Sequence, residues 1–100
     1  MTDVWLPIRY RDFYDVPRAI VIEREGDLFL LDCRFDSETD DYEANYAVYK
    51  LPAELHDDID RISWTDLGHR GQRVGSVPTD AVEFDPTKRR AVSDRFFEAL

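Results

Sequence analysis

Two apolar stretches on either side of a single glycine constrain the fold more than any other feature. Residues 19–23 (AIVIE) are apolar on both faces of an extended chain, and residues 28–35 (LFLLDCRF) return after the short segment 24–27 around Gly26. A glycine between two runs of this kind favours a tight hairpin turn. In the second run, one face would carry Phe29, Leu31, Cys33 and Phe35. The sequence therefore predicts an antiparallel β-hairpin in the first third of the chain.

Other segments are expected to extend this hairpin into a sheet. Residues 8–14 (IRYRDFY) alternate between apolar and charged side chains, and Pro7 limits any strand before them to a sheet edge. Residues 15–18 (DVPR) are expected to form a turn. Residues 45–51 (NYAVYKL) are rich in β-forming side chains. Because consecutive strands with short connections pair antiparallel, these segments predict an antiparallel sheet.

A short helix is expected after the sheet strands. Pro52 suits the first position of a helix because it needs no hydrogen-bond partner there. Leu55, Ile59 and Ile62 are spaced so that they would form one apolar stripe on a helix over residues 53–62.

A second helix is expected at the C-terminus. Asp85 followed by Pro86 is a strong helix start, since the carboxylate can accept from free backbone amides and proline has no amide to satisfy. The buried stripe of this helix would consist of Val92, Phe96, Ala99 and Leu100.

These elements predict one globular domain over residues 1–100 with an α+β fold. It would be dominated by an antiparallel sheet of about five strands, with the short middle helix and the C-terminal helix packed on it. If residues 53–62 form a loop instead, the fold becomes mainly β. Two more short strands are expected around Pro78.

Residues 74–82 (VGSVPTDAV) resemble the end of SH3 domains, where a strand, a proline-containing 3₁₀ turn and a closing strand follow one another. The resemblance covers about a tenth of the chain and implies a small SH3-like barrel. The peptide-stacking tyrosine of that pattern falls at Ala81, and the N-terminal aromatic motif of the family is absent. These departures argue against the binding of proline-rich peptides.

The charge of the chain excludes some partners. The net charge is −9, and residues 1–60 hold 16 acidic and 6 basic side chains. Non-specific nucleic-acid binding needs a basic face, so we do not expect it. No apolar run is long enough to cross a membrane, and no signal peptide is visible. The one cysteine, Cys33, fits a reducing compartment, and a cytoplasmic location is expected.

The segment 35–46 (FDSETDDYEANY) is expected to be the loop of a second hairpin, and it concentrates the acidic side chains. Five carboxylates fall within eight residues, with tyrosines in and beside them. In protein interfaces, rings supply contact area and carboxylates supply association rate and specificity, a chemistry used by inhibitors of basic enzymes. The sequence therefore predicts docking of a protein partner with a basic surface. The candidate partner-binding residues are Asp36, Glu38, Asp40, Asp41, Tyr42, Glu43, Tyr46 and Tyr49.

Two other interpretations of this segment stay open. One is a solvated hairpin tip whose charges keep edge strands from pairing with other chains. The other is a cation site. An EF-hand loop needs glycine at its sixth position and glutamate at its twelfth, but counting from Asp36 these positions hold Asp41 and Ala47. Only a loose cation site would remain, and we expect neither a specific metal site nor a cofactor.

Two basic segments are candidates for anion binding. Residues 68–75 (GHRGQRVG) combine glycines, which free backbone amides, with positive side chains, although they lead into a strand rather than a helix. Residues 88–90 (KRR) would lie in the first turns of the C-terminal helix, where the helix dipole disfavours cations. An anionic ligand or the acidic half of the chain would offset that cost. The candidate anion-binding residues are His69, Arg70, Arg73, Lys88, Arg89 and Arg90.

Three classes of function follow from these features. The first is a binding protein of the inhibitor, immunity or adaptor kind that acts through the acidic loop. The second is a structural subunit that forms homo-oligomers through an uncovered sheet edge. The third is a small enzyme or ligand-binding protein that uses the His69 loop. No pairing of a nucleophile with a base is visible, so no catalytic residue is assigned.

Overall fold

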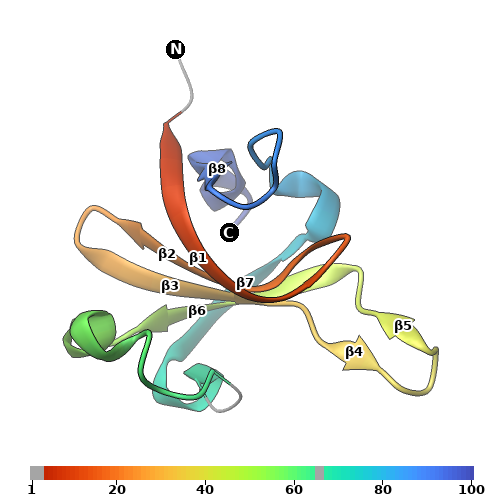
Figure 1. Ribbon diagram of the computed structural model, residues 1–100, viewed down its shortest axis with the longest axis horizontal. Helices are drawn as coiled ribbons and strands as arrows, with labels where there is room; N and C mark the ends of the chain where they lie inside the picture. Colours follow the sequence, from red (N-terminus) through yellow and green to blue (C-terminus); the bar gives the residue numbers. More distant parts are fainter. Residues whose placement is uncertain (1–3, 65–66) are drawn as a thin grey trace.

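The computed structural model describes residues 4–64 and 67–100 and shows a mainly β fold (Figure 1). Six antiparallel strands form one sheet in the order β7-β6-β3-β2-β1-β8. These strands are β1 (Trp5–Tyr14), β2 (Val16–Arg24), β3 (Asp27–Asp32), β6 (Asn45–Leu51), β7 (Gln72–Pro78) and β8 (Ala91–Ser93). A separate two-stranded ribbon consists of β4 (Phe35–Asp36) and β5 (Asp41–Tyr42). The helical turns described are all 3₁₀: η1 (Ala53–Asp58), η2 (Leu67–Arg70), η3 (Thr79–Ala81) and η4 (Asp94–Ala99).

The central hairpin predicted around Gly26 is confirmed. β2 and β3 pair from Ala19 opposite Asp32 to Arg24 opposite Asp27. Glu25 and Gly26 form the turn between them, with φ angles of 53° and 83°. Two successive residues with positive φ match the turn whose twist suits a two-residue hairpin, and glycine adopts such angles without steric cost.

The predicted turn at residues 15–18 is shorter than expected. Only Asp15, with φ of 67°, lies between β1 and β2, and Tyr14 pairs directly with Val16. Pro17 lies inside β2 opposite Phe13. The fixed φ of proline is compatible with an extended chain, so Pro17 does not prevent the strand.

Pro7 lies in a part of β1 that pairs on one side only, as the sequence predicted, although β1 as a whole lies between β2 and β8. Residues Trp5, Leu6 and Pro7 pair with β8, and the amide of Ile8 donates to the carbonyl of Arg90 at 3.0 Å. Pro7 is the last of these paired positions. The proline therefore lies at the end of the pairing with β8, whereas the rest of β1 pairs only with β2.

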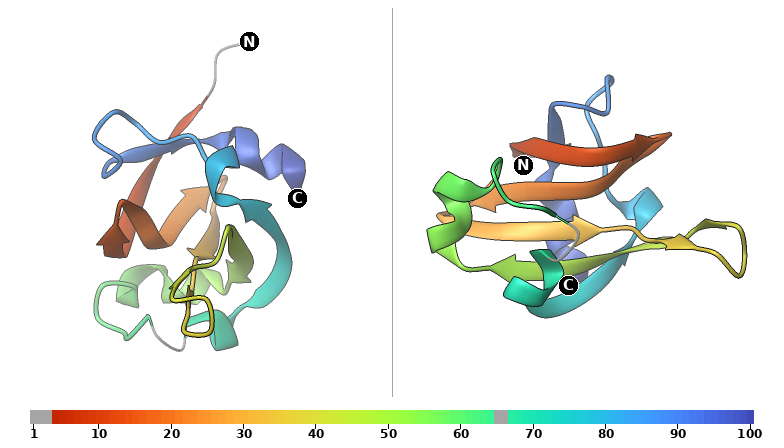
Figure 2. Two further views of the ribbon diagram at one scale, coloured as in Figure 1. Left: turned by 90° about the vertical axis from the view of Figure 1, so that its right-hand side faces the viewer. Right: turned by 60° about the horizontal axis from the view of Figure 1, so that its bottom comes forward.

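Two apolar cores lie on opposite faces of the sheet, which explains why residues 19–22 are apolar at every position. Alternate side chains of β2 enter different cores, Ile20 and Ile22 the first and Val21 the second. The first core is closed by β8, η4 and the segment around Val82. The second is closed by the segment that contains η1 and η2. Figures 1 and 2 show these covers on the two sides of the bent sheet.

The middle helix predicted over residues 53–62 is replaced by the single 3₁₀ segment η1 and turns. Leu55 and Ile59 are nevertheless buried in the second core, with Ile62 packed beside them. The carbonyl of Asp58 accepts from the amides of Arg61 and Ile62, which tightens the chain into a turn and ends the helical stretch. The predicted apolar contacts are thus made by a more irregular backbone.

The predicted C-terminal helix is also wrong. Asp85 accepts hydrogen bonds from the backbone amides of Thr87, Arg90 and Ala91 and from the Thr87 hydroxyl, and so it closes a loop at 86–90 rather than starting a helix. Val92 then lies in β8, and only Asp94–Ala99 are helical. Phe96 is buried in the first core as predicted, but Ala99 and Leu100 are exposed.

The segment that resembles the end of SH3 domains has part of the expected local structure. β7 ends at Pro78 and the 3₁₀ turn η3 follows, but residues 81–84 form no strand beyond an isolated bridge between Phe84 and Val92. Among the described strands, β7 and β8 remain the two ends of the sheet. The sheet is therefore bent and open in its hydrogen bonding.

Candidate functional site

The acidic segment forms a ribbon that projects from the body of the protein. Phe35 of β4 pairs with Tyr42 of β5, and Asp36 pairs with Asp41. The carboxylate of Asp36 accepts from the amide of Glu38 at 2.9 Å, a local bond that closes the turn at the tip. Figure 1 and the right-hand view of Figure 2 show this ribbon beyond the end of the main sheet. We call residues 35–43 the acidic hairpin.

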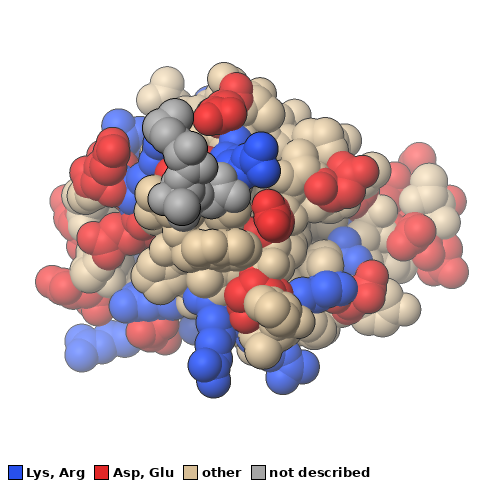
Figure 3. Space-filling model, turned by 90° about the horizontal axis from the view of Figure 1, so that it is seen from above, with Lys and Arg blue, Asp and Glu red and all other residues tan. Residues whose placement is uncertain are grey.

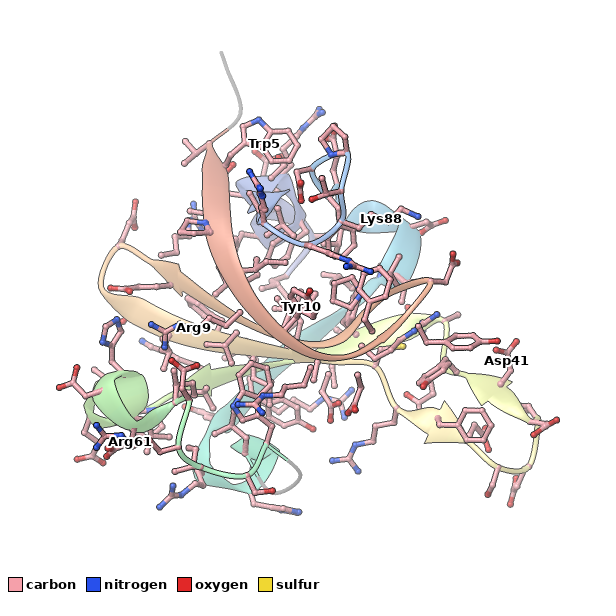
Figure 4. All side chains as sticks on the ribbon, in the orientation of Figure 1. Trp5, Arg9, Tyr10, Asp41, Arg61 and Lys88 are labelled. Carbon is pink, nitrogen blue, oxygen red and sulfur yellow. The ribbon has the colours of Figure 1, made fainter. Side chains whose placement is uncertain are left out.

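The five carboxylates of the acidic hairpin form no ion pair with any other described residue. The ion pairs of the described residues lie elsewhere, and none includes Asp36, Glu38, Asp40, Asp41 or Glu43. Figure 3 shows acidic atoms grouped at the hairpin end, and Figure 4 shows Asp41 out on the ribbon. Their negative potential is therefore directed to solvent, where it can act on an approaching cationic surface.

Three aromatic rings line the base of the acidic hairpin. The ring of Tyr42 lies 5.3 Å from the ring of Phe35 and 5.5 Å from that of Tyr14, measured between centroids. Phe35 is 52% exposed and Tyr14 is 65% exposed. We call Tyr14, Phe35 and Tyr42 the aromatic ridge. Large rings that stay exposed beside unpaired charges are the residue types that dominate protein interfaces.

Arg18 supports the aromatic ridge from below. Its guanidinium lies 4.2 Å from the centre of the Tyr42 ring, and its Nε donates to the carbonyl of Tyr14 at 2.9 Å. The Cys33 thiol donates to the carbonyl of Glu43 at 3.1 Å. Burial raises the pKa of this thiol, so Cys33 anchors the hairpin base as a neutral side chain.

Tyr46 lies away from the docking surface on which the sequence placed it. Its side chain is 0% exposed in the first core, and its hydroxyl donates to the carbonyl of Pro17 at 2.7 Å. Burial raises the pKa of this hydroxyl well above its usual range. Tyr49 is half-buried against the second core beside Gly68. Of the three candidate tyrosines, the structure brings only Tyr42 together with the acidic hairpin.

Sequence reasoning missed Tyr14 and Phe35 as members of the site. Phe35 was assigned to the buried face that it would share with Cys33, but the chain leaves the main sheet after Asp32 and exposes the ring. Tyr14 is far from the hairpin in sequence and reaches it only because β1 and β2 turn at Asp15. The sequence signal that could have pointed to Tyr14 was its position at the end of the alternating segment 8–14, directly before a turn.

The charged side chains of the candidate anion-binding loop at 68–75 do not lie together. His69 ends up in η2 and lines a groove beside the sheet, whereas Arg70 and Arg73 are exposed outside that groove. At Gly71, an added Cβ would lie 2.7 Å from the carbonyl oxygen of Lys50. The glycine therefore serves close packing of the chain at that position rather than an open anion cradle.

The basic residues Lys88, Arg89 and Arg90 occupy the loop at 86–90, so no helix dipole acts on them. Lys88 has φ of 59°, and Arg89 lies over the ring of Phe13 at 4.7 Å. Figure 4 shows Lys88 on the side of the sheet that carries β8. The structure therefore keeps this basic loop apart from the His69 segment and gives no common anion site to the two.

The described residues contain neither a cluster of metal ligands nor a membrane-spanning helix. Within 4–64 and 67–100, no group of three or more His, Cys, Asp or Glu side chains is placed to hold a metal ion. None of the helical segments there is long and apolar enough to span a bilayer.

Comparisons with known proteins leave the geometry as the only guide to function. Neither the protein-family models, nor the curated proteins, nor the solved structures include a match to this chain.

Proposed function

We propose that the protein acts by binding a protein partner with a basic surface, and that the acidic hairpin is the docking element. The observation that carries this proposal is the set of five unpaired carboxylates on a projecting ribbon, directly beside the exposed aromatic ridge. The carboxylates would steer the encounter, and the rings of Phe35 and Tyr14 would supply the buried contact. The buried free thiol of Cys33 is compatible with the reducing compartment expected from the sequence.

The test compares two variants that gain the same three units of charge. In the hairpin variant, Asp40→Asn, Asp41→Asn and Glu43→Gln are combined. Asparagine tolerates the φ of 55° at position 40 and keeps the acceptor that holds the amide of Tyr42 at position 41. In the control variant, exposed carboxylates on η1 and η4 are neutralised by Glu54→Gln, Asp58→Asn and Glu98→Gln.

Each protein is immobilised and exposed to a lysate of its source at low salt and at about 0.5 M salt, where exposed charges are largely screened. We expect a basic protein to be captured at low salt by the wild type and by the control, and lost from the hairpin variant. Equal capture by all three proteins would contradict the proposal. Recovery of only further copies of this chain would favour the oligomeric subunit instead.

A further inference from the structure

The ribbon of the acidic hairpin has two different faces. Phe35 and Tyr42 lie directly opposite each other in the register, and so do Asp36 and Asp41. Because successive side chains of a strand point to opposite sides, one face of the ribbon carries the two rings and the other carries the two carboxylates. The aromatic ridge therefore lies on the face from which Asp36 and Asp41 point away.

Arg18 already contacts one ring of the aromatic ridge from within the molecule. Its guanidinium lies 4.2 Å from the centre of the Tyr42 ring, and its Nε donates to the carbonyl of Tyr14. A guanidinium can stack flat on a ring because it is planar, delocalised and more weakly hydrated than an ammonium group. This internal contact is an example of the kind of cation that the ridge accepts.

Phe35 and Tyr14 are the exposed rings of the ridge. Phe35 is 52% exposed and Tyr14 is 65% exposed, although each ring packs against that of Tyr42. The cationic side chains that lie over rings in the described part of the chain use other rings, and none lies over Phe35 or Tyr14. These two rings are thus available to a cation that comes from outside the molecule.

The charge around the ridge favours a cation as its occupant. Residues 35–43 hold five carboxylates and no basic side chain, so the single guanidinium of Arg18 leaves this end of the molecule strongly negative (Figure 3). The potential of exposed charges extends over about 10 Å at 0.1 M salt, and it therefore reaches a group placed on the rings. An uncharged apolar occupant would gain nothing from this potential.

The geometry favours a guanidinium over an ammonium group. Asp36 and Asp41 point to the opposite face, and each already accepts a backbone amide, from Glu38 and Tyr42 respectively. A cation on the rings is therefore held by ring contact and by the surrounding potential rather than by a direct pair with these two carboxylates. Arginine suits such a site because its guanidinium stacks on rings, whereas the compact ammonium of lysine is strongly hydrated and acts as a point charge.

We propose that the aromatic ridge binds an arginine side chain of the protein partner, with its guanidinium stacked on the exposed rings of Phe35 and Tyr14. This inference rests on the proposed docking through the acidic hairpin and adds the residue type by which the partner is recognised. The carboxylates attract the basic surface, and the rings select arginine over lysine within that surface. A partner whose basic surface consists of lysine alone would dock more weakly.

The test is an NMR titration of the ¹⁵N-labelled protein at low ionic strength with two peptides, acetyl-Gly-Arg-Gly-Arg-Gly-amide and its lysine counterpart. The peptides have the same charge and length, so they differ only in the side chains that carry the charge. We expect both peptides to shift the amides of residues 35–43, and the arginine peptide to bind about two- to fivefold more tightly. No shift of these amides by either peptide would overturn the proposal.

Three variants separate ring contact from attraction by charge. Tyr14→Leu with Phe35→Leu keeps apolar side chains at both positions but removes the rings, so the preference for arginine should fall to less than about 1.5-fold. Trp5→Leu, the matched control, removes an exposed ring at the other end of β1 and should keep the wild-type preference. The hairpin variant should weaken the binding of both peptides equally and keep the preference.

The outcomes distinguish this inference from the proposed function. If the ring variant kept the preference for arginine while the hairpin variant lost affinity for both peptides, the stacking would be wrong and docking by the acidic hairpin would stand. If the ring variant lost the preference but the hairpin variant bound as tightly as the wild type, the arginine contact would stand and attraction by the carboxylates would fail. Equal affinity of the wild type for the two peptides would overturn the inference.

Discussion

At the scale of single residues, Tyr46 shows how a polar atom is accommodated in the first core. The ring is fully buried, and the hydroxyl has one partner, the carbonyl of Pro17. Replacement by phenylalanine keeps the ring but leaves that carbonyl without its donor. We expect Tyr46→Phe to lower the free energy of unfolding by about 1–3 kcal/mol, measured by urea denaturation.

Tyr49 provides the matched control for that measurement. It lies on the same strand, is half-buried, and its hydroxyl makes no hydrogen bond with another described residue. Tyr49→Phe should therefore change stability by less than about 0.5 kcal/mol. If the two variants lost equal stability, the hydrogen bond to Pro17 would not be the cause.

The burial of Tyr46 could be predicted from the sequence, but its exclusion from the docking surface was missed. Tyr46 and Val48 are two positions apart in the strand 45–51, so their side chains point to the same face of the sheet. If Val48 is in the core, Tyr46 is in the core as well. Tyr42 belongs to the separate ribbon, so the alternation of strand 45–51 does not determine which way its side chain points. The sequence contains no signal for where the ribbon leaves the sheet, because that depends on the path of the chain after Asp32.

His56 links stability to pH near neutrality. Its Nε2 lies 2.8 Å from a carboxylate oxygen of Glu23, and this hydrogen bond raises the pKa of the imidazole. The protonated form is thus favoured by folding. The stabilisation should be complete below the unfolded pKa of about 6.5 and should be lost as pH rises through the higher folded pKa.

The variant His56→Gln tests this link by denaturation across the pH range. The stability difference between wild type and variant should be constant at pH about 5 to 6 and should shrink above about 6.5. Glu23→Gln should show the same pH dependence, because it replaces the charged carboxylate by a neutral amide that favours the protonated imidazole less. A difference that grows with rising pH would contradict the assignment.

At the scale of elements, Asp85 holds the loop that delivers β8 to the edge of β1. Its carboxylate accepts the Thr87 hydroxyl and amide and the amides of Arg90 and Ala91. These hydrogen bonds lower the pKa of Asp85, and the bond from the Thr87 side chain has the largest effect. The ionised form therefore stabilises the fold above the unfolded pKa of about 3.9, and this stabilisation is lost as pH falls through the folded value.

Asp85→Asn should be less stable than the wild type at neutral pH, because an amide oxygen accepts more weakly than a carboxylate. The difference should shrink as pH falls below about 4, which can be followed by thermal unfolding at a series of pH values. Asp80→Asn, at an exposed carboxylate, serves as the comparison. A deficit for Asp85→Asn that persists unchanged at the lowest pH would show that its charge is not responsible.

The same residue explains why the C-terminal helix was predicted wrongly. An aspartate followed by proline can cap a helix or close a loop, since both arrangements need a carboxylate to accept from amides a few positions onward. The spacing of Val92 and Phe96 fits a helical stripe, but it also fits a strand followed by a 3₁₀ turn. Pairing of Val92 with Leu6 of β1, a contact distant in sequence, decides between them.

At the scale of the whole molecule, the central strands and the turn at Gly26 followed from local pattern, whereas β8, the turn at Asp15 and the sites did not. The β2–β3 hairpin and β6 could be predicted because alternation and turn residues are local signals. The aromatic ridge joins residues from the end of β1 and from the ribbon. Such assemblies depend on the order of strands in the sheet, which one sequence does not specify.

The structure shows where part of the acidic first half of the chain lies. The acidic hairpin extends from the sheet end with its five carboxylates unpaired. Five of the 16 acidic side chains of residues 1–60 therefore lie on one projecting element. At its base, the Arg18 guanidinium is stacked on the Tyr42 ring.

The measurement that tests the central claim most directly is the association rate constant between this protein and the captured basic partner, by surface plasmon resonance at low salt. Steering by exposed charges acts mainly on association, so the hairpin variant should associate at least about fivefold more slowly than wild type. The charge-matched control on η1 and η4 should stay within about twofold of wild type. Equal rates for the hairpin variant and the control would contradict docking through the acidic hairpin.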